Sequence, residues 1–330
     1  MGKDRSEGPV VGVDLGGTNM AIGVVDEKGR ILGRCKRKTK AMEGRDKVLA
    51  RLVEGIERAC DEAKVPMKDI RAVGVGAPSA VDWEKGVVIH AGNLGWKRFP
   101  LREALEKRLD RTVVVDNDVN VAAFGESRVG AGKGRGDLLA MWVGTGIGGG
   151  LILNGQLWRG PLHTAGEVGH VILFPGAGPG HRKLEEHCSR TAMVRSMMML
   201  IGHYPESMLR EFLKGETDGA EPSIGSGVIA ECYEKGDPLV TSVVNASADL
   251  LGLAIANLIT VLSLPTVILG GGVTEALGKP WLHRVREAVE AHVFPSSLRK
   301  CEVVASELGD DAGLLGAAML ARETAQGQKG

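Results

Sequence analysis

The 330-residue chain lacks the features that mark several large classes of protein. It has no excess charge of either sign, because 41 lysines and arginines balance 41 aspartates and glutamates. No overall field draws it to nucleic acid or to an anionic membrane, so we expect neither partner and favour a small molecule. Its longest apolar stretch, residues 250–264, is interrupted by Gly252, Asn257 and Thr260 and is too short to span a bilayer. A buried helix is expected there.

Cysteine pairs and a secretion signal are also missing. The five cysteines are scattered and none forms a C-x-x-C pair, which argues against a disulfide framework or an iron–sulfur cluster. The first eight residues are polar and contain no apolar core of the kind found in signal peptides. These observations together predict a cytoplasmic protein.

Two common nucleotide-binding motifs are absent, but two glycine-rich segments take their place. The chain has neither a Walker lysine nor a G-x-G-x-x-G run leading into a helix, which disfavours a P-loop or Rossmann site. Residues 14–19 (DLGGTN) and 144–150 (GTGIGGG) instead lie between apolar runs that alternate as strands do. Glycine turns let backbone N–H groups approach phosphate oxygens. We therefore predict a phosphate clamp built from Gly16, Gly17, Thr18 and Asn19 in the first turn and from Gly144, Thr145 and Gly146 in the second.

One acidic residue stands immediately before the first glycine turn. Asp14 is placed to hold Mg²⁺, either directly or through water, next to a bound phosphate.

The order of expected elements predicts two α/β domains. Strands are expected at 10–13, 19–25, 30–35, 70–75, 112–115, 138–143, 151–153, 266–269 and 301–305. Helices are expected at 48–59, 101–109, 118–129, 183–201, 237–263, 281–292 and 312–322. Each half opens with a strand, a glycine turn and a second strand, so a ligand cleft is expected between two domains. We place the border near Asp116, with a small domain of 1–116 plus the C-terminal helix 311–330 and a large domain of 117–310.

Motifs along nearly the whole chain resemble one known family. They are DLGGT (14–18), GAP (76–78), NL (93–94), NDVN (117–120), GTGIGGG (144–150), AGEVGH (165–170), LE (184–185), GGGV (270–273) and LGDDAG (308–313). Their order and spacing are similar to those of the ROK family (repressors, open reading frames, kinases), in its sugar-kinase branch within the actin-like ATPase superfamily. The resemblance implies two actin-like, RNase H-like domains and a glucokinase-like enzyme that uses ATP and Mg²⁺. A homodimer is expected because relatives form one.

The resemblance also assigns roles to individual residues. Asp118 matches the general base that takes a proton from a hexose hydroxyl, commonly O6. Without the resemblance, a cap of the following helix would be the favoured interpretation of this aspartate. The positions that match sugar contacts are Asn93, Asn117, Asp118, Glu167, His170 and Glu185. Gly270, Gly271 and Gly272, at the end of a strand, match the position that holds the adenosine.

The chain departs from the family pattern in one segment and at two pocket positions. Many relatives carry a zinc site made by a histidine and three cysteines, but Gly176, Gly178 and Lys183 stand at the cysteine positions, so we predict no zinc site. His170 then needs another group to orient its ring. Ser79 and His163 also differ from the usual residues and are candidates for altering the preferred sugar.

Other functions stay open at this stage. The sugar may be an N-acetylhexosamine or fructose rather than glucose, and some relatives use polyphosphate as donor. Related repressors sense sugars without catalysis, but they carry an N-terminal DNA-binding domain, for which about nine residues before the first strand are too few. An actin-like ATPase would not need the Asn117, Asp118, Glu167 and His170 cluster.

Overall fold

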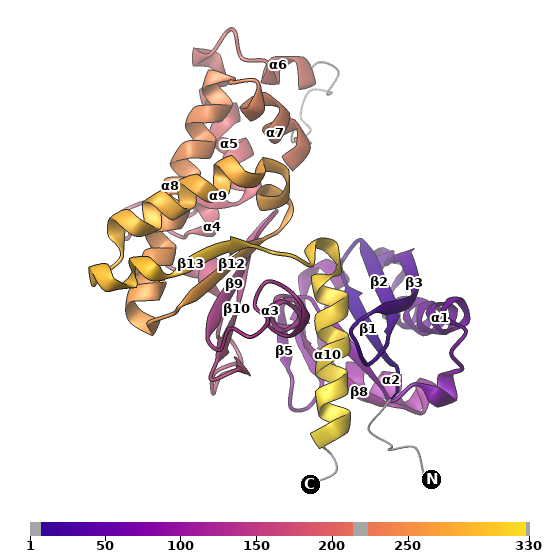
Figure 1. Ribbon diagram of the computed structural model, residues 1–330. Helices are drawn as coiled ribbons and strands as arrows, with labels where there is room; N and C mark the ends of the chain where they lie inside the picture. The colour runs from indigo at the N-terminus through magenta and orange to yellow at the C-terminus, as the bar shows by residue number, and fades with distance from the viewer. Residues whose placement is uncertain (1–7, 214–223, 328–330) are drawn as a thin grey trace. The chain divides into compact units, whose positions relative to one another are not determined.

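The computed structural model describes residues 8–213 and 224–327. Its contacts group the chain into two units (Figure 1): Met1–Gly136 with Gly150–Gly166 and Asp310–Gly330, and Asp137–Gly149 with Glu167–Gly309. The first unit extends past the border expected near Asp116, because the helix that follows this residue packs against the C-terminal helix. The division into two functional domains stays a prediction.

The strands that we expected along the chain are present, together with four short ones that we did not expect. They are β1 (Val10–Leu15), β2 (Asn19–Val25), β3 (Ile31–Lys38), β4 (Ala72–Ala77), β5 (Ala80–Asp82), β6 (Val87–Ala91), β7 (Trp96–Phe99), β8 (Thr112–Asn117), β9 (Leu138–Val143), β10 (Ile147–Leu153), β11 (Gln156–Trp158), β12 (Thr266–Gly270) and β13 (Glu302–Ala305). The unexpected strands, β5, β6, β7 and β11, have three to five residues each, which is too few for a clear alternating pattern.

Most of the expected helices are present, together with two that we did not expect, over 209–212 and 226–234. They are α1 (Arg45–Ala63), α2 (Leu101–Leu109), α3 (Asp118–Val129), α4 (Glu185–Cys188), α5 (Arg190–Leu200), α6 (Leu209–Phe212), α7 (Ser226–Glu234), α8 (Pro238–Leu262), α9 (Gly272–His292) and α10 (Ala312–Gly327). The expectation of one long helix over 183–201 is wrong. Ser189 ends α4 and caps α5, since its hydroxyl accepts the N–H of Ala192 at 3.1 Å, and Lys183 lies before both helices.

The first unit contains a five-stranded sheet in the order β3-β2-β1-β4-β8, with helices on both faces, and a three-stranded sheet in the order β5-β6-β7. In the larger sheet β1, β2 and β3 are antiparallel, as the expected meander requires, and β4 and β8 run parallel to β1. Val11 and Val13 of β1 point into the core that α1 completes. Gly12, between them, faces α10 so closely that a Cβ would lie 2.0 Å from the carbonyl oxygen of Leu314. The sheet is therefore covered by α1 on one face and by α10 on the other.

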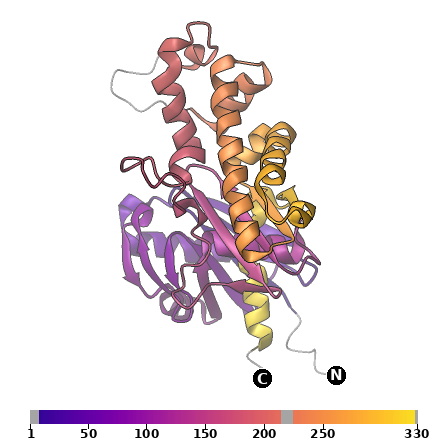
Figure 2. The ribbon, with the colours of Figure 1, turned by 90° about the vertical axis from the view of Figure 1, so that its left-hand side faces the viewer.

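The second five-stranded sheet has the order β11-β10-β9-β12-β13, and β12 runs parallel to both β9 and β13. Helix α8 begins at Asp237 and Pro238 as expected, and the Asp237 carboxylate accepts the N–H of Val240 at 3.0 Å. Figure 2 shows α8 running beside α5, with which it is in contact. By length and composition α8 could cross a membrane, but most of its apolar side chains are buried within the unit. This burial fits the expected core helix.

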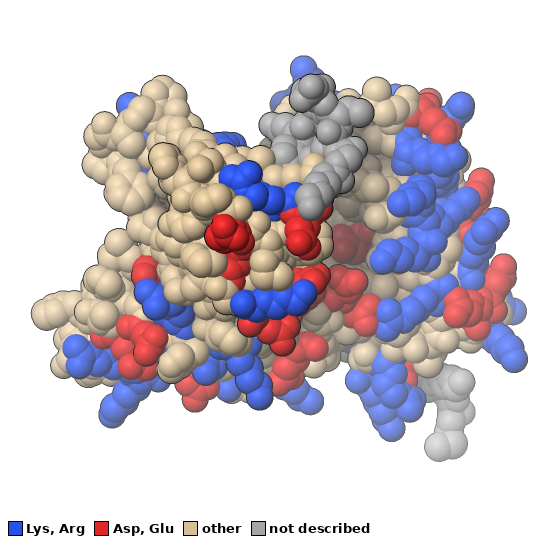
Figure 3. All heavy atoms as spheres, turned by 90° about the horizontal axis from the view of Figure 1, so that it is seen from above, with Lys and Arg blue, Asp and Glu red and all other residues tan. Residues whose placement is uncertain are grey.

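Figure 3 shows charged side chains of both signs near one another on one face, together with a broad area that has few charges of either sign.

Candidate functional site

The first glycine turn joins β1 to β2 in a hairpin rather than leading into a helix, as predicted. The N–H of Gly16 donates to the carbonyl of Asn19 at 2.9 Å, and the hydroxyl of Thr39 donates to the carbonyl of Gly16 at 2.6 Å. Gly17 packs on Asn93, because a Cβ added at Gly17 would lie 2.9 Å from the Asn93 Cβ. The turn is thus fixed from two sides and brings one predicted sugar residue to the predicted phosphate loop.

Asp14, at the end of β1, is a carboxylate in an unfavourable electrostatic setting. Burial, and to a smaller extent the like charge of Asp310, raises its pKa to about 6. A Cβ at Gly313 would lie 2.8 Å from the Asp14 carboxyl carbon, so helix α10 begins directly against this group. Two neighbouring carboxylates of this kind are suitable ligands for a hard divalent cation such as Mg²⁺.

Asn117 and Asp118 lie where β8 ends and α3 begins, and Asn117 is the residue that caps the helix. Its side-chain oxygen accepts the N–H groups of Val119 and Asn120 at 2.9 and 3.0 Å. Its amide nitrogen donates to Oδ1 of Asp118 at 3.0 Å and to the carbonyl of Ser79 at 2.9 Å. The same Oδ1 of Asp118 accepts the N–H of Val119 at 2.9 Å. Asn117 is therefore the capping residue of α3, and Asp118 shares with it the N–H of Val119.

The second glycine turn joins β9 to β10 and is held by residues of the second unit. The N–H of Gly144 donates to the carbonyl of Gly146 at 2.9 Å. Glu185 accepts the N–H of Ile147 at 2.8 Å, and its carboxylate lies so close that a Cβ at Gly146 would be 2.4 Å from it. Arg190 donates to the hydroxyl of Thr145 at 2.8 Å, which puts a positive charge beside the predicted phosphate loop.

The third glycine group forms the turn between β12 and α9. Gly271 has a φ of 87°, and a Cβ there would lie 2.6 Å from the carbonyl oxygen of Val143, so this position requires glycine. Gly270 ends the strand and Gly272 begins the helix. The turn therefore lies at the carboxyl end of a parallel strand, where open α/β sheets bind ligands.

Glu167 directly precedes the short 3-10 turn Val168–His170, and His170 ends it. Nε2 of His170 is 3.8 Å from Oε2 of Glu167, so the two side chains point the same way, as their spacing predicted. Nδ1 of His170 is 3.1 Å from the ammonium nitrogen of Lys183. Because an ammonium group only donates, Nδ1 accepts and the neutral ring carries its proton on Nε2.

Comparisons with known proteins find matches over almost the entire chain. The family model described as "ROK family" matches residues 10–324. The chain belongs to the ROK family. The glucokinase of Thermotoga maritima is 35% identical over 320 residues, which cover 95% of this chain and 97% of the relative.

This chain is also similar to a solved kinase structure and, in sequence, to a repressor. A ROK family glucokinase from Streptomyces griseus, solved with glucose and AMPPNP, is 35% identical with a TM-score of 0.80, and the match covers 96% of this chain and all of that one. The xylose repressor of Caldicellulosiruptor bescii is 27% identical, and the match covers 95% of this chain and 78% of the repressor. Within the ROK family, the fold is therefore shared by sugar kinases and by sugar-responsive regulators.

The segment in which the ROK resemblance placed cysteines is closed by hydrogen bonds in this chain. Lys183 pairs with Ile172 in an isolated antiparallel bridge, and the N–H groups of Arg182 and Lys183 both donate to Glu186, at 2.6 and 2.8 Å. Phe174 packs edge-on against His187 with ring centres 4.7 Å apart. Lys183, at a former cysteine position, thus supplies the cation that faces His170.

Several residues that contact the predicted site were missed from the sequence. Asp310 lies beside Asp14, Arg190 beside Thr145, and Lys183 beside His170. Asp116, which directly precedes Asn117, forms an ion pair with Arg159. Asp310 lies in the LGDDAG motif (308–313) and Asp116 in the DND run (116–118), but neither motif shows which distant residue its side chain contacts.

Proposed function

We propose that this protein is a hexose kinase that transfers the γ-phosphoryl group of ATP to a sugar hydroxyl, with glucose and its O6 as the first candidates. Membership of the ROK family and the similarity to glucokinases support the reaction class. The observation that carries the mechanism is the fixed carboxylate of Asp118 at the start of α3.

In this mechanism Asp118 accepts the proton of the attacking hydroxyl. Two N–H donors, from Asn117 and Val119, face Oδ1 and stabilise the ionised carboxylate that a base requires. The sugar oxygen then forms a bond to the γ-phosphorus while the bond to the bridging oxygen of the leaving ADP breaks. The proton ends on Asp118, so atoms and charges balance.

The phosphates of ATP are proposed to lie on the backbone of the two glycine hairpin turns, Gly16–Asn19 and Gly144–Gly146, with Gly270–Gly272 toward the adenosine. Asp14, with Asp310 beside it, would hold Mg²⁺, because its raised pKa shows a carboxylate whose charge is poorly compensated within the protein. When bound, the ion neutralises charge on the phosphates.

The sugar contacts proposed for Asn93, Glu167, His170 and Glu185 rest on the family match. Asn117 is different, because both its oxygen and its nitrogen already have two partners each. Its first role is to hold Asp118, and a sugar hydroxyl would reach its amide only by replacing the bond to Ser79. The cytoplasmic location, the homodimer and the lack of a nucleic-acid partner stay predictions.

The test is ADP release over a panel of glucose, mannose, fructose, N-acetylglucosamine and N-acetylmannosamine, with ATP and polyphosphate compared as donors. We expect release that depends on sugar and falls by about 10²–10⁴-fold in Asp118→Asn, while nucleotide binding persists. Asp110→Asn is the matched control, because Asp110 is an exposed aspartate at the end of α2 in the same unit.

Three outcomes would contradict parts of the proposal. An unchanged rate in Asp118→Asn removes Asp118 as the base. ADP release at full rate without sugar identifies an ATPase. Sugar binding without any release identifies a non-catalytic sugar sensor, as in the regulators of the family.

A further inference from the structure

Arg159 connects the end of β8 to the β5–β6 hairpin. Its Nε donates to Oδ2 of Asp116 at 2.6 Å, and the two side chains are only 14% and 2% exposed. Its guanidinium carbon lies 4.1 Å from the centre of the Trp83 ring, in the loop between β5 and β6. The Arg159 guanidinium therefore forms an ion pair with the buried Asp116 carboxylate and a cation–π contact with the Trp83 ring at the same time.

On the side of the ion pair, Asp116 organises the start of α3. Its Oδ1 accepts the backbone N–H of Asn117 at 2.7 Å and the side-chain amide of Asn120 at 3.2 Å. Because Arg159 occupies the other oxygen, Oδ1 remains available to these two donors. Asn117, oriented in this way, in turn donates to Oδ1 of Asp118.

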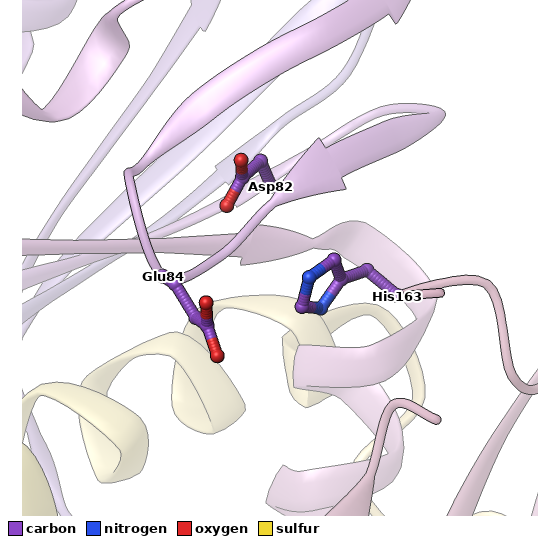
Figure 4. Close-up of side chains that lie close together, drawn as sticks. All are labelled: Asp82, Glu84 and His163. Atoms are coloured by element: carbon purple, nitrogen blue, oxygen red, sulfur yellow. The ribbon is translucent and has the colours of Figure 1, made fainter. Parts of the chain in front are cut away.

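On the aromatic side, Trp83 is itself held in place by His163. Nε1 of Trp83 donates to Nδ1 of His163 at 3.0 Å, so the neutral imidazole carries its proton on Nε2. A ligand atom of this ring and the carboxylates of Asp82 and Glu84 all lie within 4.8 Å of one another (Figure 4). An Nε2 that carries a proton is suited to donate to these carboxylates rather than to ligate a metal ion.

We propose that Arg159 is a positioning residue for phosphoryl transfer. Through Asp116 it holds Asn117, whose side-chain amide orients the Asp118 carboxylate. Through Trp83, the same guanidinium connects this hydrogen-bonded group to the β5–β6 hairpin. This inference rests on the proposed role of Asp118 as the base. Without the guanidinium, Asp116 would be a buried carboxylate in need of other donors, and the amides of Asn117 and Asn120 are the nearest ones.

A double-mutant cycle on kcat tests the proposal. Arg159→Met keeps the length of the side chain but removes its charge, and we expect kcat to fall by about 10–100-fold, as for a catalytic group displaced by about 1 Å. KM for ATP should change by less than about threefold, because none of these contacts involves the glycine turns. Arg159→Lys restores the charge but not the planar stack, and should recover part of the rate.

The decisive comparison repeats Arg159→Met in the Asp118→Asn background under single-turnover conditions. If Arg159 acts through Asp118, its loss has no further effect there, since the group that it positions is already gone. Equal losses in both backgrounds, or an unchanged kcat in the single variant, would overturn the positioning role. A wild-type rate in Asp118→Asn alone would instead overturn the base assignment. If Arg159→Met does not fold, Arg159→Lys carries the same comparison.

Discussion

The raised pKa of Asp14 makes a quantitative prediction about the ligand-free protein. The folded chain holds a proton on this carboxyl up to a pH of about 6, whereas the unfolded chain loses it near 3.8. Between these values the folded state binds more protons than the unfolded state, so the free energy of unfolding falls as pH rises. The shift of about two pKa units corresponds to a loss of at most about 3 kcal/mol that is complete above pH 7.

Asp14→Asn removes this loss, because an amide does not ionise. Relative to the wild type, the variant should gain about 2–3 kcal/mol of unfolding free energy between pH 4 and pH 8. Urea unfolding at several pH values, without Mg²⁺ or nucleotide, measures the difference. With saturating Mg²⁺ and ATP the order should reverse, because ligand binding stabilises the wild type while the variant has lost the proposed metal ligand.

Asp26→Asn is a matched control with the opposite sign. Burial alone would raise the pKa of Asp26, but hydrogen bonds from Arg30 and Lys28, at 2.7–3.0 Å, lower it on balance. This variant should therefore lose stability at neutral pH, and the loss should shrink as the pH falls through the low folded pKa of the wild-type residue. A stability difference between Asp14→Asn and the wild type that stays constant from pH 4 to pH 8 would refute the reasoning about Asp14.

Two further substitutions test positions where the chain departs from the family pattern. Ser79 has a left-handed φ of 66°, so Ser79→Gly should raise the free energy of unfolding by up to about 1 kcal/mol. The hydrogen bond from Asn117 should persist, because it is accepted by the backbone carbonyl of residue 79. Kinetics on the sugar panel then test specificity, and an unaltered ranking of sugars would exclude an effect of the Ser79 side chain. Lys183→Met removes the ammonium group that faces Nδ1 of His170, so KM for the sugar should rise by about 3–10-fold. Thermal stability should change little, because this pair is exposed. In a separate experiment, a zinc-selective chelator should leave the wild type fully active. Wild-type KM in Lys183→Met, or inactivation by the chelator, would contradict this account.

Local patterns in the sequence were sufficient to predict most of the regular structure. The bounds of β2, β9, α2 and α3 agree with expectation to the residue, because strand alternation, a polar cap or a following turn defines both ends. The expected helix over 183–201 failed because a serine can either continue a helix or cap a new one, and Ser189 caps. The range given for α9 begins at Gly272 rather than at 281 because it joins two helical segments across Gly278, which has non-helical backbone angles; the expected helix over 281–292 lies in the second segment.

Contacts between distant residues could not be predicted in the same way. Arg159 is 43 residues from Asp116, and Asp310 is almost at the opposite end of the chain from Asp14. No periodic pattern links such positions, and each becomes a neighbour only when the sheet of the first unit has formed. The predicted site residues came from glycine turns and family motifs, whereas the groups that tune them come from the tertiary fold.

These distant partners distinguish three aspartates that look alike in the sequence. Asp14, Asp116 and Asp118 each lie at or just beyond the end of a strand of the first sheet. Asp14 is beside another carboxylate and has a raised pKa, a setting that a bound cation would relieve. Asp116 is neutralised by Arg159, which suits a structural anion. Oδ1 of Asp118 accepts two N–H donors, from Asn117 and Val119, so its carboxylate is held in a fixed orientation. These three environments support the proposed roles of Asp14 as a metal ligand, Asp116 as an anchor and Asp118 as the base.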